Sequence, residues 1–103
     1  MGTQTRTPTD TFAAVTACFS TDLAALIGEE APRSITPTGF VDLVERAMHV
    51  LDRANVDSRR RAGEELEHAI GWLTDALTTT GSDQRDQLAR ARTHLRSALE
   101  TTR

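Results

Sequence analysis

The chain has 103 residues, a formal net charge of −3 and a sequence pI of about 5.5. It is therefore long enough for one domain with its own core, and it lacks the bulk positive charge of a nucleic-acid-binding protein. A single cysteine, Cys18, excludes an intramolecular disulfide and a cysteine-based metal site. No apolar run approaches the roughly 20 residues that span a bilayer, and residues 1–11 lack the apolar segment of a secretory signal. We therefore expect a cytoplasmic protein, with neither a membrane nor a nucleic acid as its partner.

Residues 1–9 are polar and rich in threonine, which is typical of a flexible tail, and residues 10–103 are predicted to form a single helical domain. The first helix is expected to begin at Thr9 or Thr11 and to end at Gly28. Its apolar residues recur at helical spacing and form one stripe: Phe12, Val15, Phe19, Leu23, Leu26 and Ile27. Residues 29–34 follow as the longest connection, with Pro32 and two glutamates.

The second helix has a clear start signal, because Thr36 is a typical N-cap and Pro37 suits the first helical position. The helix is expected to end near Asn55. Its apolar residues cover about half of the circumference, since each residue advances the helix by about 100°. They are Phe40, Val41, Leu43, Val44, Ala47, Met48, Val50 and Leu51. A stripe this wide either packs between two neighbouring helices or faces a partner.

The third helix is expected to begin at Asp57 and Ser58 and to be capped by Gly81. Its stripe consists of Ala62, Leu66, Ala69, Ile70, Leu73, Ala76 and Leu77. The fourth helix should begin at Ser82 as N-cap, and it carries a narrower seam of Leu88, Ala91, Leu95, Ala98 and Leu99.

No segment alternates between apolar and polar residues as a strand does. Four amphipathic helices predict an all-α fold, namely an up-down four-helix bundle. The alternative is a hairpin of the third and fourth helices that forms a dimeric bundle, with the first two helices packed outside.

The spacing of Glu65 and His68 is that of a ligand pair in di-iron helical bundles, because side chains three residues apart share one face of a helix. A complete site needs a second such pair, and the sequence contains none. The helical wheel also places His68, His49 and His94 away from the predicted core. Glu65 and His68 are therefore retained only as an alternative metal site, and no cofactor is predicted.

Three consecutive cations, Arg59, Arg60 and Arg61, are expected in the first turn of the third helix, where they oppose the helix dipole. They could bind an anion or the carboxylates of a partner; the alternative is a solvated run of charges. In an up-down bundle the end that carries these arginines would also carry the start of the first helix and the end of the fourth, and it would be basic. It would also gather Arg6, Arg53, Arg96 and Arg103, against Asp10, Asp52, Asp57 and Glu100. The opposite end would gather acidic residues, among them Asp22, Glu29 and Glu30.

Trp72 is predicted on the flank of the third helix, where it either covers the edge of the core or anchors an interface. Gly71 and Gly63 lie in the same helix, and each weakens it by up to about 1 kcal/mol relative to alanine. A glycine on the outer face could allow another helix to approach closely.

The sequence contains no glycine-rich phosphate loop, nucleophile elbow or His-Glu-x-x-His motif, so it favours a non-enzymatic role. Our leading hypothesis is a small helical interaction or regulatory module that contacts a protein partner and forms a homodimer. It would use the broad face of the second helix or the flank that carries Trp72. The alternative is a helical bundle that binds a metal or a small ligand through carboxylate and histidine side chains.

Overall fold

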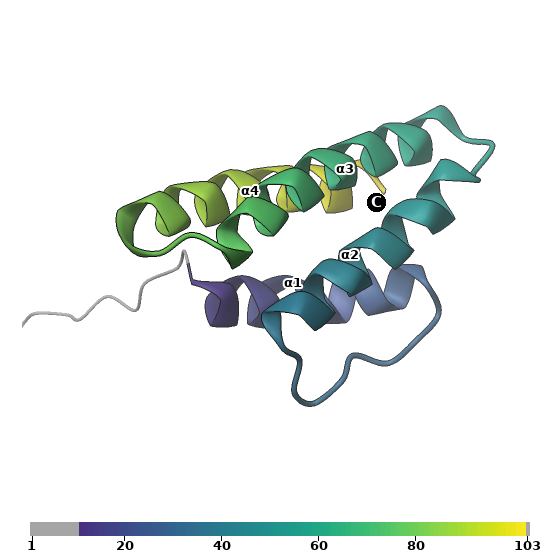
Figure 1. The fold of residues 1–103 in the computed structure, drawn as a ribbon. Helices are drawn as coiled ribbons and strands as arrows, with labels where there is room; N and C mark the ends of the chain where they lie inside the picture. The colour runs from purple at the N-terminus through teal and green to yellow at the C-terminus, as the bar shows by residue number, and fades with distance from the viewer. Residues whose placement is uncertain (1–10, 103) are drawn as a thin grey trace, which may run out of the picture.

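A computed structural model describes residues 11–102. These residues form four α-helices and no strand (Figure 1): α1 (Phe12–Leu26), α2 (Pro37–Asp52), α3 (Asp57–Leu77) and α4 (Gly81–Thr101). The two longest helices, α3 and α4, pack most closely, α2 packs on α3, and α1 packs on α2 and touches α4. The prediction of an all-α four-helix bundle is confirmed. The tail predicted at residues 1–9 lies outside the described residues.

The helix starts differ in how closely they match their predicted caps. The hydroxyl of Thr11 accepts a hydrogen bond from the Ala14 N–H at 3.1 Å, and that of Thr36 accepts one from the Gly39 N–H at 3.0 Å. At the start of α3 the N-cap is Val56, which makes no side-chain cap, and Asp57 already lies in the first turn. The N-cap of α4 is Thr80, two residues before the predicted Ser82, and it also makes no side-chain cap.

The single chain forms one hydrophobic core, to which all four helices contribute buried apolar residues. The wide apolar stripe of α2 is almost completely buried, because α2 packs between α1 and α3. Its buried residues are Phe40, Val41, Leu43, Val44, Ala47 and Leu51. Val50, which is 39% exposed, is the main part of the stripe left uncovered. Of the two possibilities for this stripe, the structure therefore shows packing between two neighbours.

The direction of α1 differs from a simple up-down order. α1 and α2 run the same way, and the connection of residues 27–36 returns along the molecule to the start of α2 (Figure 1). Asp22 and Leu26 near the end of α1 lie beside Leu99 and Thr102 at the end of α4, so these two helices are also parallel. Such a return is possible because ten extended residues reach about 33–36 Å, whereas the 16 residues of α2 rise about 24 Å.

An exposed ion-pair network joins the connection to α2. Arg46 donates from Nη1 to both carboxylate oxygens of Glu29 at 3.0 Å, and from Nε to Asp42 at 3.2 Å. The hydrogen bond with Glu29, helped by the nearby charges of Glu29 and Asp42, raises the pKa of Arg46. All these groups are exposed, so the network contributes little to the free energy of unfolding. It links residues 27–36 to α2 at the surface.

Candidate functional site

Polar and aromatic side chains gather along one edge of the seam between α3 and α4. The His94 Nδ1 lies 2.9 Å from the Glu65 Oε1, which joins the two helices by a hydrogen bond. The ring of His68 stacks on the ring of His94, with a centroid distance of 5.2 Å and an angle of 28° between the planes. We call these three residues the histidine cluster. The side chains of Glu65 and His94 are each about one third exposed, so solvent reaches the cluster.

The short turn between α3 and α4 brings the cluster together. Gln84 at the start of α4 donates its Nε2 to the carbonyl of Ala76 at 3.0 Å, close to the turn. This bond helps to set the antiparallel register that places His94 opposite Glu65. None of the three histidines belongs to the apolar core; His94 is half-buried because it contacts Glu65 of α3, whereas His49 is exposed on α2.

The histidine cluster has poor geometry for a metal ion. A chelated ion needs the in-plane lone pairs of two imidazoles to converge on one point, but stacked rings direct them side by side. The predicted ligand pair is also separated, because the carboxylate of Glu65 contacts His94 instead of pairing with His68. Among residues 11–102, no group of three His, Cys, Asp or Glu side chains is placed to hold a metal ion.

Trp72 continues the same edge of the seam toward the turn between α3 and α4. The guanidinium carbon of Arg90 lies 5.1 Å from the centre of the Trp72 ring, which is within the range of a cation–π contact. Trp72 is half-buried and packs against the core. The interpretation of Trp72 as a residue at the core edge is therefore correct, and one part of its ring remains exposed.

A shallow hollow lies on the outer side of α3, next to Trp72. It is lined by Glu67, His68, Gly71, Trp72 and Asp75. Gly71 forms part of its floor, and a Cβ added there would meet no atom within 4 Å. The φ angle of Gly71 is not positive, so the backbone does not require glycine. Gly71 therefore costs about 1 kcal/mol of helix stability relative to alanine, and neither the packing nor the backbone of α3 requires glycine there.

Gly63 is different from Gly71, although both lie inside α3. A Cβ at Gly63 would lie 2.7 Å from the Asp52 Oδ1 and 3.4 Å from the Leu51 Cβ, at the contact between α3 and α2. The close packing of two helices therefore accounts for Gly63. Of the two glycines that the sequence singled out, only Gly71 has no explanation within the described residues.

The arginine triplet does not form an isolated positive site. Arg60 donates to the carboxylate of Asp57 in the same turn of α3, and the hollow beside it is lined by Asp57, Arg60, Arg61 and Glu64. Two carboxylates thus accompany two guanidinium groups in this hollow. Asp57 also lies in the first turn, where it offsets the unfavourable position of the arginines relative to the helix dipole.

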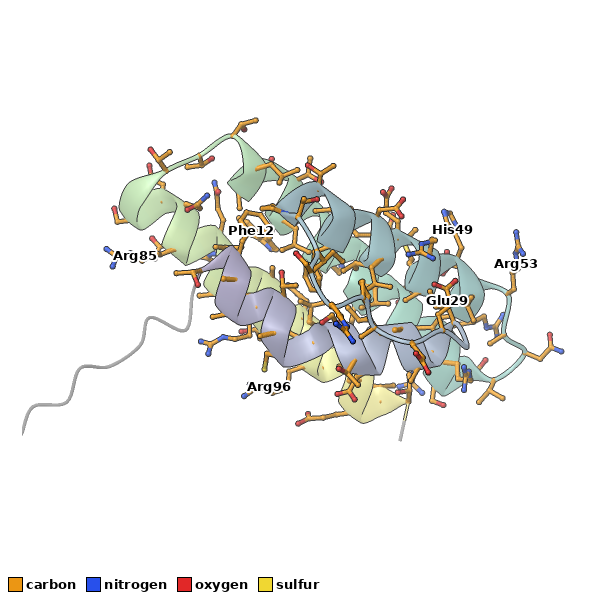
Figure 2. The ribbon with its side chains drawn as sticks, turned by 90° about the horizontal axis from the view of Figure 1, so that it is seen from below. Phe12, Glu29, His49, Arg53, Arg85 and Arg96 are labelled. Carbon is orange, nitrogen blue, oxygen red and sulfur yellow. The ribbon has the colours of Figure 1, made fainter. Side chains whose placement is uncertain are left out.

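The predicted separation into a basic end and an acidic end is wrong. Because α1 is parallel to α4, the end of α1 lies at the same end of the molecule as the arginine triplet. Figure 2 shows Glu29, Arg53 and His49 toward the same end of the molecule, while Phe12 lies toward the other end, where Arg85 also lies. Asp22, near Thr102 at the end of α4, adds a further acidic group here. Arg6, Asp10 and Arg103, which were part of the prediction, lie outside the described residues.

Arg90 and His94 are the members of the site that were not predicted as site residues. Arg90 and His94 are four residues apart, so they share one side of α4, just as Glu65, His68 and Trp72 share one side of α3. This spacing was the signal in the sequence that could have identified them. The structure brings these five residues together along one edge, whereas the arginine triplet lies nearer to the start of α3.

The fold and the site define this chain as a small all-α four-helix protein with a mixed aromatic and charged edge between α3 and α4. Within residues 11–102, no helix is long and apolar enough to cross a membrane. Comparison of the chain with protein-family models, curated proteins and solved structures gives no match.

Proposed function

We propose that this chain is a small non-enzymatic helical module that acts through protein–protein contacts and associates with itself. The observation that carries the proposal is the open hollow over Gly71, on the exposed side of α3 beside its seam with α4. The apolar stripes of the helices are largely buried within the chain, so the proposal does not use the broad face of α2. The surface that remains combines a glycine floor, a tryptophan edge and charged walls.

Each part of this surface suits a protein contact. Tryptophan is enriched at the centres of interfaces, because its large ring buries much area and loses little conformational freedom. Glycine lets a partner backbone approach closely. Glu67, His68 and Asp75 are exposed and supply polar groups around the apolar part, as the rim of an interface does. As part of the proposal, the module acts in the cytoplasm, a location suggested by its single cysteine.

Light scattering of the purified protein over a range of concentrations tests this proposal. We expect the apparent mass to rise from monomer toward dimer as the concentration increases. Gly71→Arg fills the hollow with a long charged side chain and should keep the protein monomeric. Ala17→Arg introduces the same side chain at an exposed position on α1 and is the matched control, which should associate as the parent does. A monomer at every concentration up to about 1 mM would overturn the proposal.

A further inference from the structure

A line of arginines runs along the side of α4 that is turned away from the histidine cluster. Each residue advances an α-helix by about 100°, so Arg85, Arg92 and Arg96 lie within about 40° of one another and about 160–180° from His94. We call these three residues the arginine edge. Arg85 and Arg96 are exposed, and Arg92 is half-buried. Figure 2 shows Arg85 and Arg96 projecting from the same side of α4.

The two exposed arginines of this edge differ from other arginines of the chain in their surroundings. Arg46 and Arg60 both make ion pairs with neighbouring carboxylates. Within residues 11–102, neither Arg85 nor Arg96 makes an ion pair, although Glu100 lies one turn after Arg96. The edge therefore presents guanidinium groups that no described carboxylate neutralises by direct contact.

The part of α4 that carries the arginine edge is basic as a whole. Residues 85–97 contain four arginines and one carboxylate, Asp86. Asp86 lies about 80–120° around the helix from the members of the edge, so it does not interrupt their line. On α1, Asp22 lies beside Leu99 and Thr102, beyond the last arginine of the edge. An approaching anion therefore meets a continuous positive stretch along α4.

A hollow lies over the second half of the arginine edge. It is lined by Arg92, Thr93, Arg96, Ser97 and Glu100. Two guanidinium groups thus stand against one carboxylate, with two hydroxyl side chains between them. Because a guanidinium group can bind a carboxylate through two parallel hydrogen bonds, this hollow suits the acidic side chain of a partner.

We propose that the arginine edge binds an acidic segment of another protein, namely a helix that presents glutamate or aspartate side chains along one face. The edge extends over about 16–17 Å from Arg85 to Arg96, which corresponds to about three turns of a partner helix. Opposite charges in matching positions speed the encounter and select the partner. This inference goes beyond the proposed function, because the hollow over Gly71 lies on α3 and the arginine edge lies on the far side of α4.

An acidic protein fits this edge better than a nucleic acid does. The chain has a net charge of −3, and the positive stretch is limited to one part of one helix. The chain has no tyrosine, and its one tryptophan, Trp72, lies on α3, so neither residue type is present on the edge to stack with a base.

Binding of a fluorescein-labelled peptide, followed by fluorescence anisotropy, tests this inference. The probe is an alanine-based helical peptide with three glutamates, spaced as Arg85, Arg92 and Arg96 are but in reverse order. The control peptide carries glutamine in place of each glutamate. We expect the glutamine peptide to bind at least about tenfold more weakly than the glutamate peptide. Added salt should weaken the binding of the glutamate peptide, because it screens exposed charges.

Variants of the protein show whether the arginine edge is the binding site. Arg85→Glu and Arg96→Glu should each weaken binding of the glutamate peptide at least about tenfold. Arg33→Glu makes the same change of net charge at an exposed position of the connection before α2, and it is the matched control, which should bind within about twofold of the parent. Circular dichroism should show that all three variants are folded, because these arginines are exposed.

The remaining outcomes would overturn the inference. Absence of peptide binding up to about 1 mM, or equal binding by Arg96→Glu and the parent, would exclude the arginine edge as the site. A single-stranded DNA oligonucleotide that binds the parent more tightly than the peptide, and binds Arg96→Glu weakly, would make a nucleic acid the partner. If Arg96→Glu abolishes self-association of the protein, a second copy covers the edge instead.

The proposed self-association can fail or stand independently of this inference. Gly71→Arg changes the hollow on α3 and leaves α4 unchanged. It should keep the protein monomeric and still bind the glutamate peptide as the parent does. A parent that is monomeric at every concentration but binds the peptide through Arg85 and Arg96 would overturn the proposed self-association and support the acidic partner.

Discussion

Replacement of Gly71 by alanine should stabilise the isolated protein. Gly71 lies inside α3, is exposed, has no positive φ angle and has empty space where a Cβ would stand. Alanine therefore adds helix propensity and removes freedom from the unfolded chain without a clash. The expected gain in the free energy of unfolding is about 0.5–1 kcal/mol, which raises the Tm by about 2–8 °C for a domain of this size. Urea and thermal unfolding, followed by circular dichroism at low concentration, measure this gain on the monomer.

Gly81 provides a matched control of opposite sign. It is also exposed and also has empty space around its Cβ position, but its φ angle is +70°. An L-residue in this left-handed conformation costs roughly 1–2 kcal/mol, so Gly81→Ala should lower the free energy of unfolding. A loss of stability in Gly71→Ala, or a gain in both variants, would refute the reasoning. Stabilisation of the monomer by Gly71→Ala would show that Gly71 is not retained for folding.

Three further outcomes are expected from the structure. Thr36→Ala removes the hydroxyl that caps α2 and should lower the free energy of unfolding by about 0.5–2 kcal/mol, whereas Thr38→Ala, on an exposed neighbouring residue, should have little effect in the same urea titration. Leu66→Ala opens a cavity in the core of α3 and should cost about 2–5 kcal/mol, and a smaller loss would mean that the core repacks. Addition of Zn²⁺, Mn²⁺ or Fe²⁺ should leave the Tm unchanged, because the two imidazoles stack instead of converging; a rise in Tm that His94→Asn abolishes would contradict this reasoning.

The positions and directions of three helices could be predicted because local rules determine them. Apolar periodicity indicated every helix, and Thr36 with Pro37 marked the start of α2. The connections after α2 and α3 span only residues 53–56 and 78–80, which forces neighbouring helices to run antiparallel. Residues 27–36 are long enough either to turn or to return along α2, so the sequence left the direction of α1 open. The predicted charge separation failed for this reason, since it depended on α1.

Only the site residues on α3 could be predicted from the sequence. Glu65, His68 and Trp72 were identified from their spacing on α3, but the partner of Glu65 depends on the register between α3 and α4. Two glycines looked equivalent in the sequence, and only the neighbouring helix distinguishes them. Gly63 sits where Leu51 and Asp52 of α2 come close, so the fold itself requires a small residue there. No described part of the chain approaches Gly71 in this way. In the proposed self-association, the backbone of a second copy would approach Gly71 as α2 approaches Gly63.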